Sequence, residues 1–121
     1  MTTDPRPDPT CVFCKIVGNQ IPAIRLGENA HAIAFRDLNP QAPVHVLVIP
    51  KTHHASLAAV PAGQEAALGS LLGLAREVAA SLGVVERGYR LVINTGAEGG
   101  QVVPHLHLHL LAGRQLGWPP G

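Results

Sequence analysis

The amino-acid sequence predicts an α+β fold, in which one long helix packs on one face of an antiparallel sheet. Between Gly63 and Leu82 apolar residues recur at helical spacing. On both sides of this segment lie short β-branched or alternating runs bounded by proline, glycine or asparagine, which are typical of strands. With 121 residues the chain can bury one core but is too short for two ordinary domains.

The first elements can be followed from the N-terminus. Residues 1–10 are polar and proline-rich, and we expect them to be a disordered lead to a single folded domain at residues 11–121. A short helix is expected over residues 11–17, because Gly18-Asn19 can end it. Ile21-Pro22 then directs the chain into extended structure, and we expect strands to follow soon after.

Two apolar segments predict the first pair of strands. Residues 30–36 are strand-like, residues 37–43 form a loop that contains two prolines, and residues 44–49 are a β-branched run that Pro50 stops. We expect the two strands to pair antiparallel across this loop.

The second half of the chain contains the long helix and two further strands. Gly83 is a natural end for the helix predicted within residues 63–82. Residues 89–94 and 105–111 are predicted strands, and residues 95–101 form a glycine-rich loop between them.

Composition argues against several classes of function. A hydrophobic fraction of 46% and a charged fraction of 14% indicate a globular protein that buries some apolar surface in a subunit interface. A formal net charge of +1 argues against nucleic acid as a partner. No apolar run reaches the roughly 18 residues that cross a bilayer, and residues 1–10 lack the core of a signal peptide. We therefore expect no membrane partner and a cytoplasmic location.

A histidine ladder is the most informative segment. His105, His107 and His109 alternate with leucines, so an extended chain directs three imidazoles to one side and three leucines to the other. Successive imidazoles on such a strand are about 6.5 to 7 Å apart, close enough for a shared ligand or a proton relay.

Three interpretations of the ladder remain open. The histidines can be the polar face of a half-buried sheet, or two of them can join a third residue around a catalytic metal ion. We favour the third interpretation, nucleophilic and acid–base chemistry, because a neutral imidazole attacks phosphorus well and its neighbours can orient it and move protons. The glycines of the preceding loop, Gly96, Gly99 and Gly100, favour phosphate, since a loop with few side chains can direct backbone N–H groups toward an anion.

These residues carry a resemblance to a known family. His105-Leu106-His107-Leu108-His109-Leu110-Leu111 resembles the signature of the histidine triad family. Further segments resemble its nucleotide-binding branch: residues 37–45, 48–51, 88–90, 99–101 and the tail 113–121 with its terminal Trp-Pro-Pro-Gly.

The resemblance implies the histidine triad fold, a homodimer that extends the sheet, and a C-terminal tail that reaches toward the partner's active site. It also implies hydrolysis of purine nucleoside 5′-phosphoramidates, which are AMP or GMP derivatives. An alternative is a purine nucleotide-binding scaffold or regulatory protein whose turnover is incidental.

The resemblance also assigns roles to residues. His107 would be the nucleophile that forms a nucleotidyl-imidazole intermediate, His45 and His109 would flank and orient it, and His105 completes the triad. Asp37 would hold the ribose hydroxyls. The phosphate side would be lined by Asn94, Gly100, Gln101 and Val102, and the base would be sandwiched by Val12, Phe13, Ile16, Phe35 and Leu38. This mechanism requires no metal ion.

Two positions depart from the family pattern. Val102 stands where a serine commonly follows Gly-Gly-Gln, so a hydroxyl that could touch the phosphate or the leaving group is missing. This departure bears on the rate and the leaving-group preference. Pro104 replaces a common aromatic residue and cannot donate to a ladder, so strand pairing there should be weaker.

The only two cysteines, Cys11 and Cys14, have a spacing that suits metal binding or redox chemistry better than a structural disulfide. Cys11-Val12-Phe13-Cys14 resembles a subset of the family that holds a structural zinc, and the other two ligands would then be His53 and His105. In that case His105 is a ligand and not a participant in catalysis. The alternatives are two reduced core cysteines beside a surface His53, or a thioredoxin-like redox pair, which lacks its usual βαβ context.

Overall fold

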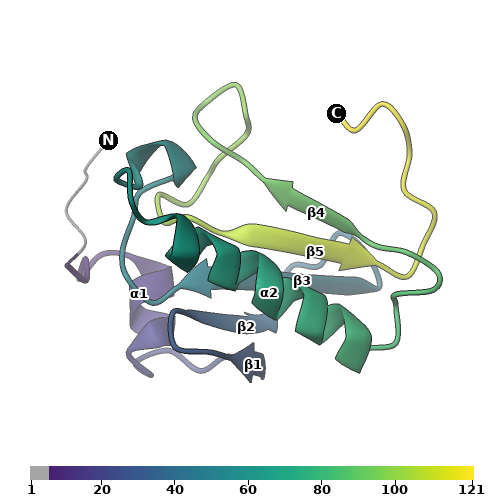
Figure 1. Ribbon diagram of the computed structural model, residues 1–121, viewed down its shortest axis with the longest axis horizontal. Coiled ribbons are helices and arrows are strands. Elements are labelled where there is room, and N and C mark those ends of the chain that lie inside the picture. The colour runs from purple at the N-terminus through teal and green to yellow at the C-terminus, as the bar shows by residue number, and fades with distance from the viewer. Residues whose placement is uncertain (1–5) are drawn as a thin grey trace.

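The computed structural model describes residues 6–121 and contains one five-stranded antiparallel sheet with strand order β1-β2-β3-β5-β4. Its elements, in chain order, are α1 (Val12–Val17), β1 (Arg25–Glu28), β2 (Ala32–Arg36), β3 (Val44–Pro50), the 3₁₀ turn η1 (Leu57–Ala59), α2 (Glu65–Ser81), β4 (Arg90–Ile93) and β5 (Leu108–Ala112). Figure 1 shows α2 lying across one face of the sheet, with α1 near the other face. The predicted α+β class and the long helix are confirmed.

The two faces of the sheet bury different cores, because side chains alternate along β2 and β3. The helix-side core joins α2 to one face through Ala32, Ala34, Val46, Val48, Leu106, Leu108 and Leu110. The opposite core joins α1 to the other face through Phe13, Ile16, Ile33, Phe35, Leu47 and Ile49. Both faces of the central strand β3 are therefore covered, and this explains why every residue of it except His45 is apolar.

The predicted pairing of β2 with β3 is confirmed, with Phe35 opposite Leu47. The long helix ends just before Gly83, whose φ of 71° is a conformation that glycine adopts without strain. The edge strand β1 had no specific prediction. Its Gly27 lies at an irregularity of the register, where a Cβ would come within 3.1 Å of Leu74 on α2.

The predicted strand at residues 105–111 is wrong at its start, because β5 begins only at Leu108. Pro104 has no N–H to donate, and the next amides are bonded outside the ladder. The N–H of His105 donates to the Val103 carbonyl at 2.9 Å, and that of Leu106 donates to the His54 carbonyl at 2.7 Å. The alternation of side chains nevertheless persists, because Leu106 shares the helix-side core with the leucines of β5.

Residues 1–5 of the expected disordered lead lie outside the described residues. Closer to α1, the N–H of Thr10 donates to Asp8 Oδ1 at 2.8 Å and the N–H of Cys11 donates to the Asp8 carbonyl at 3.0 Å. Among the described residues, no helix has the length and apolar character to span a membrane.

Candidate active site

An apolar pocket of about 320 Å³ opens beside α1, on the face of the sheet opposite α2. Eight residues predicted from the sequence line it: Val12, Phe13, Ile16, Phe35, Asp37, Leu38, His107 and His109. Sequence reasoning missed six more: Ile21, Pro22, Ala23, Arg36, Leu47 and Val103. Period-two alternation from His45 along β3 would have identified Leu47, which pairs with both Phe35 and His109.

His107 lines this pocket, and a hydrogen bond to the backbone fixes its tautomer. Its Nδ1 lies 2.7 Å from the carbonyl oxygen of His105, which can only accept, so Nδ1 carries the proton. Its ring meets Phe13 and His109 edge-on, with centroids 5.2 and 5.0 Å away. A neutral His107 therefore has its lone pair on Nε2, the nitrogen that could act as a nucleophile.

His45 and His109 form a second ordered pair. The N–H of Gln41 donates to His45 Nδ1 at 3.0 Å, so the proton of His45 is on Nε2, which lies 2.9 Å from His109 Nδ1. His109 therefore accepts at Nδ1 and keeps its own proton on Nε2. Asp37 Oδ2 lies 3.4 Å from His45 Nε2.

Both rings of this pair are neutral at physiological pH. Burial, assisted by the neighbouring His107 and His45, lowers the pKa of His109 to about 4, against a weaker opposing effect of the Asp37 carboxylate. Burial also lowers the pKa of His45, again against the Asp37 carboxylate. The ligand atoms of Asp37, His45 and His109 lie within 4.8 Å of one another, so a cation is a further candidate occupant of this trio.

The residues predicted for the phosphate side lie in or beside the glycine-rich loop, and none lines the pocket. Asn94 donates to the Gly99 carbonyl at 2.7 Å, and the Gln101 side chain donates to the Ala55 carbonyl, also at 2.7 Å. Val102 is 89% exposed.

The expected direction of the loop amides is wrong in this structure. The N–H of Gly100 donates to the Ala97 carbonyl and the N–H of Gln101 to the Gly96 carbonyl, both at 3.1 Å. These two N–H groups are already paired within the loop.

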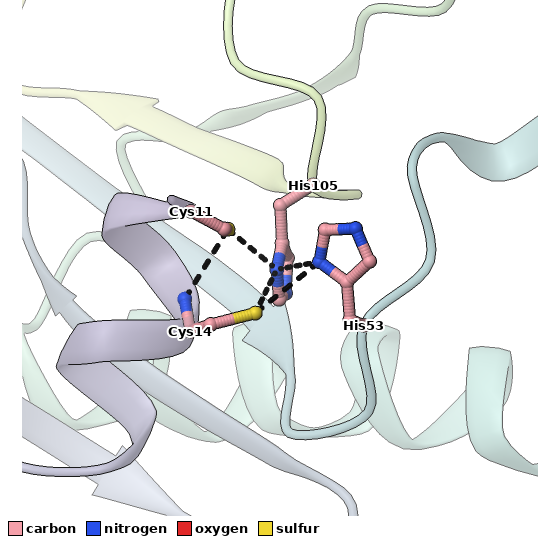
Figure 2. A group of neighbouring side chains, drawn as sticks. All are labelled: Cys11, Cys14, His53 and His105. Atoms are coloured by element: carbon pink, nitrogen blue, oxygen red, sulfur yellow. Dashed lines mark hydrogen bonds between the residues drawn. The ribbon is translucent and has the colours of Figure 1, made fainter. Parts of the chain in front are cut away.

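A Cys–His cluster, formed by Cys11, Cys14, His53 and His105, lies beside this site (Figure 2). Three separate segments contribute: the start of α1, the loop after β3, and the segment before β5. All four side chains are buried, and their ligand atoms lie within 4.8 Å of one another.

The donor set of the cluster suits a metal ion. The Nδ1 atoms of His53 and His105 lie 3.1 Å apart, and His105 Nδ1 lies 3.3 and 3.6 Å from the sulfurs of Cys11 and Cys14. A tetrahedral zinc site with typical bond lengths separates its ligand atoms by about 3.3 to 3.8 Å. The Nε2 of His105 donates to the Pro50 carbonyl at 3.0 Å, which leaves Nδ1 as a bare lone pair directed at the cluster.

Protonation of the cluster supports the same conclusion. Burial lowers the pKa of His105 to about 4, so this ring is neutral, as a ligand must be. Burial raises the pKa of the Cys14 thiol to about 11, so its proton leaves only when a cation replaces it. A buried Cys₂His₂ set of this kind can hold a metal ion with no open position.

Comparison with known proteins gives consistent results. The family model of the HIT domain matches residues 18–116. An uncharacterized HIT-like protein of Synechocystis is 54% identical over 110 residues, which cover 91% of this chain and 96% of that protein. A 14 kDa zinc-binding protein of Zea mays is 47% identical over 116 residues, which cover 94% of this chain and 90% of that protein.

Solved structures agree with the sequence relatives. A HIT family hydrolase from Legionella pneumophila has a TM-score of 0.89 and 48% identity, covering 93% of this chain and 100% of that one. A histidine triad nucleotide-binding protein from Candida albicans has a TM-score of 0.77 and 34% identity, covering 91% of this chain and 83% of that one.

Proposed function

The chain belongs to the HIT domain family, and on that premise we propose that it hydrolyses purine nucleoside 5′-phosphoramidates through a nucleotidyl-histidine intermediate. One observation carries the proposal: the backbone holds the proton of His107 on Nδ1, so the Nε2 lone pair is free beside an apolar pocket. The similarity to a solved HIT family hydrolase and to a nucleotide-binding protein supports both halves of this activity.

The reaction proceeds in two displacements at phosphorus. Nε2 of His107 attacks the α-phosphorus, an N–P bond to the imidazole forms, and the bond from phosphorus to the substrate amine breaks. The amine gains a proton as it leaves. Water then attacks the same phosphorus, the bond to His107 breaks, and the nucleoside monophosphate is released. Neither step uses the Cys–His cluster as a reacting group.

His109 and His45 act as an oriented donor pair. Because His109 accepts at Nδ1, its Nε2–H is available to the phosphoryl oxygens or to the departing nitrogen. Donors that are already in place need no reorganisation as charge develops on the phosphoryl group. The loop amides of Gly100 and Gln101 are not assigned this role, since both are paired within the loop.

The apolar pocket supplies recognition of the nucleoside. Val12, Phe13 and Ile16 of α1 line it together with Phe35, whose ring meets that of Phe13 edge-on with centroids 5.8 Å apart, and the base would pack against this apolar lining. The Asp37 carboxylate lies at the polar end of the same pocket and would accept hydrogen bonds from the ribose hydroxyls. The exposed Val102 offers no hydroxyl, and we propose that this weakens the preference between leaving groups.

We further propose a homodimer. The edge strand β4 has one hydrogen-bonded neighbour, β5, and its four residues are only half-buried, so its free edge can pair with a second copy. Leu72 on α2 is 51% exposed and adds apolar surface. Light scattering should give twice the chain mass of 12.7 kDa. Leu72→Glu should weaken the dimer, while Ile24→Glu, before the opposite edge strand β1, should leave it intact.

Zinc is the metal that we propose for the Cys–His cluster, where it would join three chain segments and have a structural role. The similar maize protein is named for zinc binding. A cytoplasmic location is part of the same proposal, because a reduced pair of cysteines persists in that compartment.

A turnover assay separates an enzyme from a binding module. Adenosine 5′-phosphoramidate is incubated with the protein, and the release of amine and AMP is followed, while AMP binding is measured by calorimetry. Release of amine and AMP in large molar excess over the protein supports the proposal. A chain that binds AMP but releases no amine from adenosine or guanosine phosphoramidates is a nucleotide-binding protein instead.

A further inference from the structure

His105 belongs to both sites of the molecule. Its imidazole is fully buried and lies among the side chains of the Cys–His cluster (Figure 2), while its backbone carbonyl accepts the Nδ1–H of His107 at 2.7 Å. The group that determines the tautomer of the nucleophile is therefore the main-chain carbonyl of a residue whose side chain belongs to the cluster.

The segment that contains these two histidines forms few other hydrogen bonds and packing contacts. It precedes β5, so His105 and His107 lack the ladder hydrogen bonds that fix a strand. The amide between them, that of Leu106, donates to the carbonyl of His54, the neighbour of His53 in the cluster. Three further supports are the burial of Leu106 in the helix-side core, the bond from His105 Nε2–H to the Pro50 carbonyl and the bond from the His105 N–H to the Val103 carbonyl; the remaining tethers run to the cluster or to the residue beside it.

A second connection runs through α1. Phe13 lies between the two cysteines in sequence, and its ring meets His105 and His107 edge-on, with centroid distances of 5.8 and 5.2 Å. Because Cys11 and Cys14 fix the first turn of α1, movement of the cluster would move the Phe13 ring against the nucleophile.

We propose that the Cys–His cluster, with its metal ion bound, positions His107 for attack and thereby sets the rate of the chemical step as well as stabilising the fold. This inference rests on the proposed hydrolase activity. His53 is then a positioning residue: it lies outside the nucleotide pocket and acts through the ring and carbonyl of His105. Misplacement of a nucleophile by as little as 1 Å can lower a rate by about 100-fold.

The test uses the full chain and compares His53→Ala with His53→Cys, since cysteine restores a metal ligand. Zinc content, kcat, KM and the AMP dissociation constant are measured for each, and ¹⁵N NMR reports the tautomer of His107. The matched control is Val78→Ala, a cavity in the helix-side core that lowers stability without touching the cluster. If His53→Ala does not fold, Cys14→Ser takes its place.

We expect His53→Ala to lose zinc and about 10-fold or more of kcat, while AMP affinity changes by less than about 3-fold. The single Nδ1–H tautomer of His107 should become a mixture, and His53→Cys should restore both rate and tautomer. An unchanged kcat and tautomer in folded, zinc-free His53→Ala would overturn the inference, as would an equal loss of kcat in Val78→Ala. If the wild-type protein hydrolyses no phosphoramidate, the proposed function fails, and the tautomer comparison alone still decides the positioning role.

Discussion

Nε2 of His45 on β3 lies 2.9 Å from Nδ1 of His109 on β5, and the backbone N–H of Gln41 determines which of the two rings donates. These two contacts make one directed chain of hydrogen bonds that ends at the pocket. Together with the His105 carbonyl, which accepts the Nδ1–H of His107, they leave each imidazole of the site with one defined tautomer.

Replacing His107 with alanine or glycine should abolish hydrolysis, with a loss of about 1,000-fold or more, because no other group at the pocket has a free lone pair directed by the backbone. AMP binding should remain within about tenfold, since the apolar lining is unchanged. Steady-state kinetics and calorimetry measure the two quantities. Wild-type turnover in either variant would dismiss the nucleophile assignment.

Asp37→Asn should reduce discrimination between ribose and 2′-deoxyribose substrates. A charge-assisted hydrogen bond contributes about 1.5 to 3 kcal/mol, so the wild-type protein should prefer adenosine phosphoramidate over its 2′-deoxy form by about 10- to 100-fold in kcat/KM. The variant should bring the two substrates close to parity. A preference that survives the substitution would place ribose recognition elsewhere.

Stability should fall as the pH drops from about 6.5 toward 4, the range between the ordinary pKa of histidine and the pKa of about 4 that burial gives His109. In this range the unfolded chain takes up a proton that the folded chain does not. His109→Gln should reduce this loss by roughly 1 to 2 kcal/mol after allowance for solvent screening. Urea unfolding at pH 7 and pH 5 measures it, and equal pH dependence in both proteins would contradict the prediction.

Protein purified without chelator should contain about one zinc per chain by elemental analysis. Cys11→Ser or Cys14→Ser should lose the metal and unfold at a lower temperature, because the cluster joins three separate segments. His54→Asn is the matched control: it neighbours His53 but has no part in the cluster, and its zinc content should be normal. Metal-free wild-type protein would count against zinc.

Deleting residues 118–121 should alter substrate preference more than stability. Trp118 is 82% exposed, and the Arg90 side chain donates to the carbonyl of Gly117, which the deletion keeps, at 2.8 Å. The deletion should therefore remove few contacts of the folded core. We expect an unfolding temperature close to that of the full chain and changed kcat/KM ratios across several amine leaving groups. Identical ratios would refute a role of the tail in specificity.

Periodicity predicted most of the fold, because β3 and α2 carry strong apolar patterns that their burial explains. The sequence could not specify β1, whose four residues include a glycine and lie at an edge. The start of β5 was wrong for a different reason. Alternation indicates which side chains share a face, but it does not show whether the backbone between them finds a partner, and at His105 and Leu106 it finds one outside the ladder.

The pocket lining that comes from α1 and β2 could be predicted better than the glycine-rich loop. Val12, Phe13 and Phe35 are fixed by a helix and a strand that the sequence identifies. The glycine-rich loop has no such constraint, and only the three-dimensional structure reveals that the amides of Gly100 and Gln101 bond to their own loop. The glycine content of the loop predicted backbone N–H donors, but it could not predict where those N–H groups point.

Side chains alternate along β2 and β3 and enter two cores that share no residue. The packing of α2 and the recognition of the nucleobase therefore lie on opposite faces of one sheet. Changes beneath α2 should alter the melting temperature while the choice of nucleobase stays the same. Changes at Phe35 or Leu47, which line the pocket and are buried in the opposite core, should alter the choice of nucleobase and lower the melting temperature as well. A protein engineer could therefore reshape the pocket for a different base and recover lost stability independently on the far side.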